Sequence, residues 1–414
     1  MMHLIDFNKK ADHFWIIGGG LMQVPLINEA RKLGLKIIVS DKDPKCVCAS
    51  SADIFFPIDT IDIQSHVDKA LYLKSLGMKI KGVLAAGIDA PITMAVTARV
   101  LGLPGVDPEI AYTVHNKALF RLKMKELGYP VPKFAVISSE KEAPSCAKKI
   151  GFPLIVKNTD SSGSRGTKIF RKPDIEGLKK IAKQAIKVSK SKTAIMEELW
   201  EGPEQTVEMI FDAKGNPHRC FITDRHFDLS KGFAIETGLR QPTALSKKVQ
   251  DQLYTMVERF AKDLGIKIGS AKADTMVTKN GPRFIEFTVR LSGGFDSQYL
   301  VPAATGKNVL KAIILTSLGK TFSLSLLKDN KGRIGVTGSI WPSAGKITRI
   351  SGLDKASRIP GIEKIIMRYK VGDKIEPYID CTKRVCFIIA TGKDEKAALK
   401  TLKQAQDTID LGVK

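Results

Sequence analysis

The sequence predicts a chain of α/β plus α+β class that is divided into several packed domains. Its first third alternates short apolar segments with amphipathic helical segments, which is typical of a parallel sheet covered by helices. From about residue 150 the strands dominate. The chain has 414 residues, of which 43% are hydrophobic, so substantial cores are possible. At roughly 150 residues per domain, this length predicts two to four domains.

The first third predicts the parallel sheet element by element. Short apolar strands are expected at residues 14–17, 36–40 and 83–85. Amphipathic helices are expected at residues 24–33 and 92–101. Gly34 and Gly102 follow these helices directly, which favours helix ends at both places.

The rest of the chain predicts mostly antiparallel structure. Strands are expected at residues 154–157, 167–170, 194–199, 205–211 and 219–223. Helices are expected at residues 175–188, 246–264 and 394–409. A hairpin turns near Asn280 and Gly281, and from about residue 331 short strands alternate with Gly and Pro turns. We therefore expect a small α+β domain at the end of the chain.

The amino-acid composition limits which classes of binding partner we expect. Lys and Arg number 66 against 43 Asp and Glu, which leaves a formal net charge of +23. The basic residues are spread along the chain and aromatic residues make up only 7%, so the charge favours anionic small substrates over nucleic acid. We find no apolar run of bilayer length and no signal peptide, and we expect no membrane partner. Six scattered cysteines without zinc spacing predict a cytoplasmic protein.

Two glycine motifs are weak indicators of a nucleotide. Residues 18–20 are three glycines between a strand and a helix, but they do not match the dinucleotide fingerprint. A tight strand-to-helix turn explains them as well. Residues 319–321 imitate the end of a Walker A loop, yet Ile314 stands where its first glycine is required. We therefore exclude a P-loop.

The segment from Lys157 to Gly166 is more informative. A lysine that closes a buried strand is costly unless its ammonium meets an anion. The small residues after it let backbone amides approach phosphate oxygens, and three serines add hydroxyl donors beside Arg165. A solvated hairpin tip with an extended lysine explains the same residues. On this segment alone both interpretations stay open.

A second candidate is a hairpin with two carboxylates, Asp274 and Glu286. Polar residues alternate with apolar ones in both strands, so Glu286, Thr288 and Arg290 share one face. A loop of three or five residues would pair Asp274 with Thr288 and bring the two carboxylates together. A loop of two or four residues would put them on opposite faces.

Converging carboxylates favour a cation between them, and Mg²⁺ prefers such oxygens together with water and nucleotide phosphates. A polar, water-facing side of the sheet is the alternative. The neighbouring residues 291–295, which include Ser292 and Gly293, are a poor strand and a good loop for approaching an anion. They favour the metal site.

The order of these segments resembles the ATP-grasp superfamily over nearly the whole chain. The resemblance rests on IIGGG (16–20), GID (87–89), HNKALFR (115–121), LGYPVP (127–132) and WPSAGKI (341–347). Within the superfamily the chain is similar to carboxylate–amine ligases such as L-amino acid ligases. Biotin carboxylase and carbamoyl-phosphate synthetase are more distant likenesses.

The resemblance implies a Rossmann-like pre-ATP-grasp domain at residues 1–115 and an ATP-grasp domain at 116–330. It also implies a lid at about 131–198 and a C-terminal α+β domain at 331–414. Lys117 and Lys157 would hold ATP phosphates. The residues implied to close over the phosphates are Ser161, Ser162, Gly163, Ser164, Gly166 and Thr167. The residues implied to contact adenine and ribose are Glu197, Glu198, Leu199 and Glu204.

The remaining roles concern the metal and the substrate. Asp274 and Glu286 would bind Mg²⁺, or Mn²⁺ in its place, and Arg290 would steady a phosphorylated intermediate. The family usually has Asn where this chain has Thr288, so the second metal position differs. Arg225, Arg240, Ser292 and Gly293 are candidates for substrate contacts. For the two arginines, solvated strand ends are the alternative.

The implied reaction joins a small carboxylate to an amine through an acyl phosphate, with release of ADP and phosphate. One alternative activates bicarbonate, as carboxylases and carbamoyl-phosphate synthetases do. Another is a nucleotide-binding regulatory protein with a degenerate site, which the exchange at Thr288 prompts. The implied partners are small-molecule substrates, and the family's habit is a homodimer.

Overall fold

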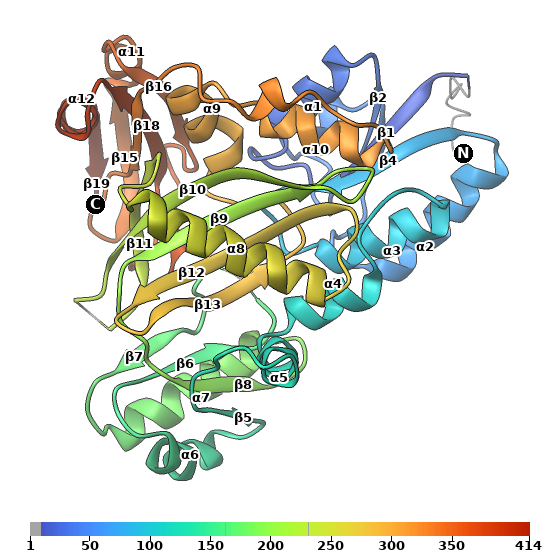
Figure 1. Cartoon of the computed structure of the whole chain (residues 1–414). Helices are drawn as coiled ribbons and strands as arrows, with labels where there is room; N and C mark the ends of the chain where they lie inside the picture. The colour runs from blue at the N-terminus through green and yellow to red at the C-terminus, as the bar shows by residue number, and fades with distance from the viewer. Residues whose placement is uncertain (1–9, 162, 231) are drawn as a thin grey trace.

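The computed structural model describes residues 10–161, 163–230 and 232–414. It arranges the described strands in four sheets with helices packed against them (Figure 1). The predicted mixture of α/β and α+β structure is confirmed. The predicted division at residues 115 and 330 stays a prediction. One sheet contains strands from both sides of the second boundary.

The first sheet is parallel, with strand order β3-β2-β1-β4. Its strands are β1 (Asp12–Ile17), β2 (Lys36–Ser40), β3 (Ile54–Phe56) and β4 (Lys79–Ala85). Its helices are α1 (Val24–Lys32), α2 (Ile63–Ser75) and α3 (Pro91–Leu101). At the turn after β1, the N–H groups of Gly19 and Gly20 donate to Asp41 and Gln23 at 2.8 and 2.9 Å. These contacts favour the structural explanation of the three glycines.

Two capped helices lead from this sheet toward the next. They are α4 (Pro108–His115) and α5 (Lys117–Glu126). The Asn116 side chain accepts hydrogen bonds from the N–H groups of Ala118 and Leu119, at 3.0 and 3.2 Å. This cap starts α5 at Lys117 and so fixes the position of that lysine in the first turn of the helix.

The second sheet is antiparallel, with order β5-β8-β6-β7, and has a core of its own. Its strands are β5 (Phe134–Ile137), β6 (Leu154–Asn158), β7 (Lys168–Phe170) and β8 (Ala194–Glu198). It packs against α6 (Ala143–Ile150) and α7 (Ile175–Val188). Residues 178, 181, 182 and 185 of α7 are buried, at the spacing of one helix face. We call this region the lid; it lies below the central sheet in Figure 1.

The central sheet has the order β13-β12-β9-β10-β11-β14-β18-β16. Its first five strands are β9 (Glu204–Phe211), β10 (Pro217–Asp228), β11 (Ile235–Gln241), β12 (Gly269–Thr278) and β13 (Gly281–Thr288). Helix α8 (Lys247–Asp263) covers one face of it. Val207, Ala273 and Phe287 pack there with Val257 and Phe260 of the helix.

The C-terminal part extends the central sheet and adds a small one. Its strands in the central sheet are β14 (Ile334–Gly338), β16 (Ile362–Met367) and β18 (Cys386–Gly392). The small sheet contains β15 (Gly345–Ser351), β17 (Lys374–Ile375) and β19 (Asp410–Val413). The helices are α9 (Val301–Thr305), α10 (Val309–Ser317), α11 (Leu353–Ser357) and α12 (Glu395–Thr408). Among the described residues, no helix is both long enough and apolar enough to cross a bilayer.

Candidate active site

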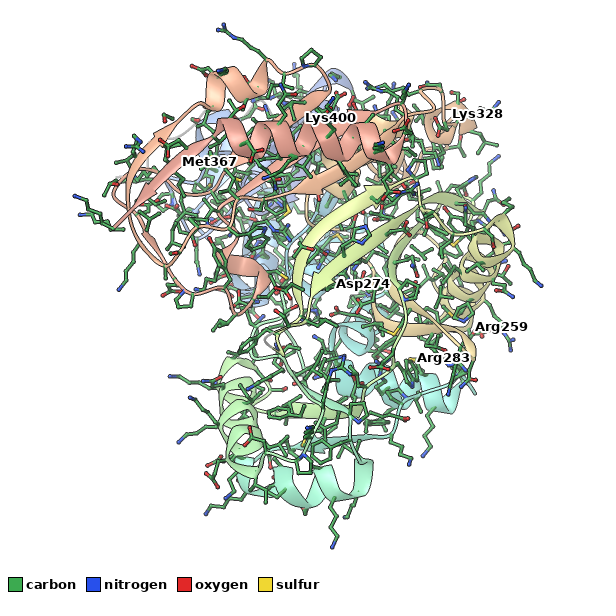
Figure 2. All side chains as sticks on the ribbon, turned by 90° about the vertical axis from the view of Figure 1, so that its left-hand side faces the viewer. Arg259, Asp274, Arg283, Lys328, Met367 and Lys400 are labelled. Carbon is green, nitrogen blue, oxygen red and sulfur yellow. The ribbon has the colours of Figure 1, made fainter. Side chains whose placement is uncertain are left out.

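One face of the central sheet is polar, opposite the face that packs on α8. Residues directly opposite each other on neighbouring antiparallel strands point to the same side of a sheet. The register therefore puts on one face Glu204, Thr206, Glu208, Thr223, Arg225, Lys272, Asp274, Glu286 and Thr288. Figure 2 labels Asp274 on the side of the sheet that is turned toward the lid.

The two carboxylates of the hairpin meet, but not in the way the loop length predicts. Thr278 pairs with Gly281, so the loop contains two residues. Two residues alone would put Asp274 and Glu286 on opposite faces. The pairing shifts by one residue after Asp274, and Ile285 is the extra residue of a β-bulge. The bulge brings both carboxylates to one face.

The same bulge changes the predicted partners. Asp274 lies directly opposite Glu286, and Thr288 lies opposite Lys272. The pairing of Asp274 with Thr288, expected for a loop of three or five residues, is therefore not formed. Thr288 is buried and faces the same side as Glu286, two residues further along the strand.

Asp274 is held by two cations and a hydroxyl. Its carboxylate lies 2.6 Å from Lys272 Nζ and 3.1 Å from Arg225 Nη1, and it accepts a hydrogen bond from Thr206 Oγ1 at 2.8 Å. Burial alone would raise the pKa of Asp274, but Arg225 and Lys272 hold it well below its ordinary value. Sequence reasoning missed Lys272, although the alternation that singled out Asp274 puts Lys272 on the same face.

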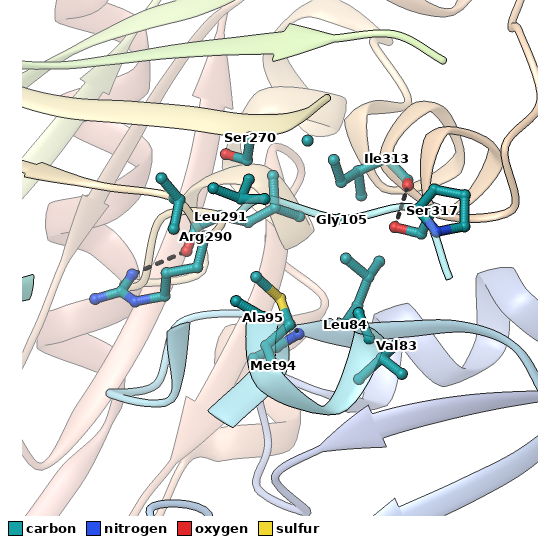
Figure 3. Close-up of a pocket in the computed structure, with 16 residues that line it drawn as sticks. Val83, Leu84, Met94, Ala95, Gly105, Ser270, Arg290, Leu291, Ile313 and Ser317 are labelled. Atoms are coloured by element: carbon teal, nitrogen blue, oxygen red, sulfur yellow. Dashed lines mark hydrogen bonds between the residues drawn. The ribbon is translucent and has the colours of Figure 1, made fainter. Parts of the chain in front are cut away.

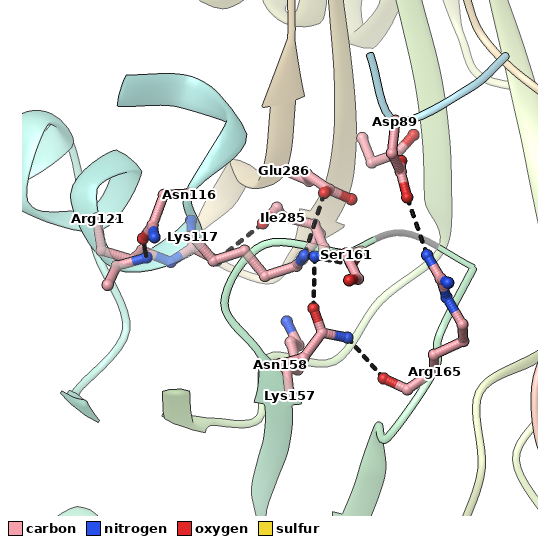
Figure 4. Close-up of polar contacts among 12 residues, drawn as sticks. Asp89, Asn116, Lys117, Arg121, Lys157, Asn158, Ser161, Arg165, Ile285 and Glu286 are labelled. Carbon is pink, nitrogen blue, oxygen red and sulfur yellow. Dashed lines mark hydrogen bonds and ion pairs between the residues drawn. The ribbon is translucent and has the colours of Figure 1, made fainter. Parts of the chain in front are cut away.

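Glu286 faces Lys117, which comes from the start of α5 (Figure 4). Lys117 Nζ lies 3.4 Å from Glu286 Oε1 and donates to the carbonyl oxygen of Ser161 at 2.9 Å. Burial would raise the pKa of Glu286, but Lys117 and Lys272 lower it below its ordinary value. Lys117 thus joins the hairpin to the lid loop.

Lys157 meets the anion that its place on a buried strand requires. Its Nζ donates to Glu197 Oε2 at 2.8 Å, and Arg121 Nε donates to Glu197 Oε1 at 2.6 Å. Glu197 is only 2% exposed. Burial would raise its pKa, but Arg121 and Lys157 lower it to about 2, so the carboxylate stays ionised.

Arg121 was not among the predicted site residues, yet it connects the lid to the hairpin. Its other nitrogens donate to the carbonyl oxygens of Phe284 and Ile285, at 3.1 and 2.9 Å. The bulge at Ile285 therefore has a charged donor on its carbonyl. A single helix, α5, places both Lys117 and Arg121 against β13.

The glycine loop, residues 160–166, is fixed at its base by Asn158. The Asn158 side chain accepts from the N–H of Ser161 and donates to the carbonyl oxygen of Arg165, both at 2.6 Å (Figure 4). Ser164 and Gly166 have positive φ angles of 58° and 63°. A side chain at position 166 would approach Ala185 of α7 to 3.1 Å, so glycine is required there.

The loop also contacts the other parts of the chain. Arg165 Nη2 lies 3.0 Å from Asp89 Oδ2, which belongs to the N-terminal part. The N–H of Cys381 donates to the carbonyl oxygen of Gly163 at 3.2 Å. Thr167 is buried at the end of the loop. The predicted loop residue Ser162 lies outside the described residues.

The segment implied to face adenine uses its N–H groups within the protein. Glu198 donates to the carbonyl oxygen of Lys133 at 2.8 Å, and Leu199 donates to that of Pro153 at 3.0 Å. The Glu198 carboxylate accepts from the N–H of Lys133 at 3.2 Å. Glu204 lies 3.6 Å from Arg225, and burial raises the pKa of its carboxyl above the ordinary value.

The two arginines predicted as a substrate clamp lie on opposite faces of the sheet. Arg225 stands on the polar face, where Glu236 at 3.0 Å joins Asp274 as its partner. Arg240 pairs in register with Asp224, one residue before Arg225, and so points to the other face. There it contacts Glu395 at 3.0 Å. The structure does not bring Arg240 to the other candidate residues.

Arg290 and the loop after it face the N-terminal part. Arg290 Nη2 lies 4.0 Å from Asp89 Oδ1, and its Nη1 donates to the carbonyl oxygen of Leu291 at 2.9 Å. The N–H of Ser292 donates to Glu208 at 3.1 Å. A side chain at Gly293 would lie 3.7 Å from Gly87, so the two segments are in close contact.

The cavity beside Arg290 is too small to hold a nucleotide. It is an apolar gap of about 20 Å³ between β4, α3 and α10, enough for one water molecule (Figure 3). Leu84, Met94 and Ile313 line it, and the Arg290 guanidinium points away from it in Figure 3.

The carboxylates Asp274 and Glu286 fit a hard divalent cation, because both are ionised and both project from rigid neighbouring strands. Among the described residues, no group of three or more His, Cys, Asp or Glu side chains is arranged around one metal position. A cation here would therefore take further oxygens from phosphate and water.

Two family models match the chain. The ATP-grasp domain matches residues 150–298, and L-amino acid ligase C-terminal domain 2 matches residues 340–414. An L-amino acid ligase from Bacillus licheniformis superposes with a TM-score of 0.80 at 21% identity, covering 98% of this chain and 99% of that one. This likeness shows the fold.

Two relatives are similar in sequence. The uncharacterized protein y4rH of Sinorhizobium fredii is 26% identical over 401 residues, which cover 94% of this chain and 80% of that protein. A D-alanine–D-alanine ligase of Pseudomonas fluorescens is 30% identical over 199 residues, which cover 45% of this chain and 57% of the ligase. Together these findings show that the chain contains an ATP-grasp domain and is similar to carboxylate–amine ligases of the ATP-grasp superfamily.

Proposed function

We propose that the protein is an ATP-dependent ligase that joins a small carboxylate to an amine through an acyl phosphate. The observation that carries the proposal is the contact of Lys117 with Glu286 at 3.4 Å. This contact supports the proposal because it joins the ammonium proposed to bind phosphate to the carboxylate proposed to bind the metal. The similarity to a D-alanine–D-alanine ligase and to an L-amino acid ligase supports amino acids as substrates.

The proposed chemistry overcomes the poor reactivity of a carboxylate. A substrate carboxylate oxygen attacks the γ-phosphorus of ATP, and the bond from that phosphorus to the bridging oxygen of ADP breaks. The nitrogen of the amine then attacks the acyl carbon. Phosphate leaves with the electrons of the broken C–O bond, and the nitrogen loses a proton. The products are an amide, ADP and phosphate.

Each part of the site has a proposed task in this sequence. Lys117 and Lys157 would bind phosphate oxygens, and Arg290 would hold the phosphorylated intermediate. Asp274 and Glu286 would bind Mg²⁺, which offsets negative charge on the phosphates when it is bound. The glycine loop, fixed by Asn158 and by the contact of Arg165 with Asp89, would exclude water from the acyl phosphate.

The proposal is tested by measuring ADP release with pooled amino acids and small carboxylates, with and without bicarbonate. We expect release that depends on an amino acid, and an amide product in the mass spectrum. A requirement for bicarbonate would replace the proposal with a carboxylase. Binding of Mg·ATP without ADP release for any acceptor would point to a regulatory protein.

A further inference from the structure

Lys272 lies in the middle of the polar face and has no role in the chemistry above. It stands opposite Glu208 of β9 on one side and opposite Thr288 of β13 on the other. Its side chain is 10% exposed, and its Nζ lies 2.6 Å from Asp274 Oδ1. A buried ammonium at this distance is a strong competitor for any other cation at the same oxygen.

Cations already occupy both carboxylates of the hairpin. Asp274 and Glu286 are contacted by three cations, namely Lys272, Arg225 and Lys117. Arg225 also contacts Glu204 and Glu236, so these three cations face four carboxylates. A divalent cation that arrives alone must displace one of the cations from its carboxylate. A divalent cation bound to the phosphates of ATP brings oxygens that can take the displaced cation as their partner.

Of the two cations on Asp274, Lys272 is the one that can leave. Arg225 is held at the same time by Glu236 at 3.0 Å and by Glu204 at 3.6 Å. Among the described residues, Asp274 is the single carboxylate within ion-pair distance of Lys272. The lysine side chain is flexible and its ammonium is compact, so it can turn from Asp274 to a phosphate oxygen nearby.

We propose that Lys272 competes with the metal for Asp274 and thereby makes divalent-cation binding depend on the nucleotide. Without phosphates, its ammonium holds the carboxylate oxygen that the metal needs. With phosphates present, the ammonium gains an alternative partner and releases that oxygen. This inference rests on the proposed function, because it takes Asp274 and Glu286 as the metal ligands and ATP as the nucleotide.

The experiment measures Mn²⁺ affinity by electron paramagnetic resonance, with and without the non-hydrolysable β,γ-imido analogue of ATP. In the wild type, we expect the analogue to tighten Mn²⁺ binding by at least about tenfold. In Lys272→Met, Mn²⁺ alone should bind at least about tenfold more tightly than in the wild type. The effect of the analogue should shrink by the same factor.

Lys307→Met is the matched control, because Lys307 is also partly buried but donates to the carbonyl oxygen of Cys220 at 2.7 Å. It should leave both Mn²⁺ affinities unchanged. Asp274→Asn should weaken Mn²⁺ binding in the presence of the analogue. If it does not, or if the wild type binds no Mn²⁺ with the analogue, the proposed function itself is wrong.

A different result would overturn the inference about Lys272 without affecting the proposed function. If the wild type and Asp274→Asn behave as expected but folded Lys272→Met binds free Mn²⁺ no more tightly than the wild type, Lys272 does not compete with the metal. Should Lys272→Met not fold, Lys272→Arg decides, since it keeps the charge and holds Asp274 through two nitrogens. Free Mn²⁺ should then bind no more tightly than in the wild type, and tighter binding would overturn the inference.

Discussion

Two sets of carboxylates lie close together beside the polar face of the central sheet, and their surroundings shift their pKa values in opposite directions. Asp274 and Glu286 have cations in contact, and these lower their pKa values despite burial. For Glu208, burial raises the pKa to about 6, and burial raises the pKa of Asp296 well above its ordinary value. Burial favours the protonated form of all four carboxyls, yet the pKa values shift in opposite directions.

The difference comes from the partners. Glu208 accepts hydrogen bonds from Ser270 Oγ and from the N–H of Ser292, at 3.0 and 3.1 Å, and Asp296 accepts from Thr223 Oγ1 at 3.0 Å. These donors are neutral, and they do not offset the cost of removing a charge from water. Ion pairs do so for the first set. Cations in contact thus keep Asp274 and Glu286 ionised, whereas the neutral donors leave the pKa values of Glu208 and Asp296 raised.

The largest effect is expected from the first set. Glu286→Gln should lower ADP release by roughly a thousandfold, about 4 kcal/mol, because the amide keeps the shape but loses the charge that binds the metal. Steady-state kinetics with the best amino-acid substrate measures it. Glu258→Gln, on the opposite side of the sheet in α8, should keep the wild-type rate. Equal rates for both variants would place the chemistry elsewhere.

Removing one of the buried cations that contact the first set should destabilise the fold. Arg225→Met leaves Asp274 and Glu236 without their shared partner and should lower the free energy of unfolding by about 3 kcal/mol. Urea unfolding measures this. In Arg219→Met, the lost pair with Asp251 is about 40% exposed, and the cost should stay below about 1 kcal/mol. Similar costs for the two variants would show that burial does not distinguish these ion pairs.

For Glu208, in the second set, the free energy of unfolding should change with pH in the opposite direction from that expected for an ion-paired acid. A carboxyl whose pKa rises on folding from 4.5 to about 6 binds its proton more tightly in the folded state. The free energy of unfolding therefore falls as pH rises through this window, by about 2 kcal/mol in total. Glu208→Gln should remove that loss and be more stable than the wild type above pH 6.

Glutamine can replace Glu208 in its contacts, because its oxygen can accept from the N–H of Ser292 while its amide donates to the Ser270 hydroxyl. Urea midpoints at a series of pH values measure the effect. If the free energy of unfolding of Glu208→Gln falls between pH 4.5 and 6 as much as that of the wild type, the fall does not come from Glu208.

Local patterns in the sequence predict the elements of the fold. The helix predicted at residues 175–188 has these bounds in the structure, because its apolar face has helical spacing and Asp174 caps it. The alternation in β12 and β13 predicts which residues share a face within each strand. The convergence of Asp274 with Glu286 was right, but it depends on the bulge at Ile285, which no local pattern indicates.

The unpredicted features of the candidate site depend on contacts between distant segments. Arg121 reaches Glu197 and the carbonyl oxygens of the bulge, which lie 76 and more than 160 residues away in the sequence. Whether Arg225 or Arg240 faces the site depends on the register of β10 with its neighbours. The roles of the site residues in binding ATP, metal and substrate stay predictions.

Asp89 extends the comparison to a carboxylate of the N-terminal part that also has cations in contact. Its oxygens lie 3.0 Å from Arg165 of the glycine loop and 4.0 Å from Arg290. Asp89→Asn should raise the KM for ATP by about fivefold, close to 1 kcal/mol, because the loop loses one attachment while the phosphate contacts remain. Asp407→Asn, which removes an exposed pair in α12, is the control and should leave KM unchanged. An unchanged KM in Asp89→Asn would mean that the contacts of the loop with Asn158, Lys117 and Cys381 are sufficient to hold it.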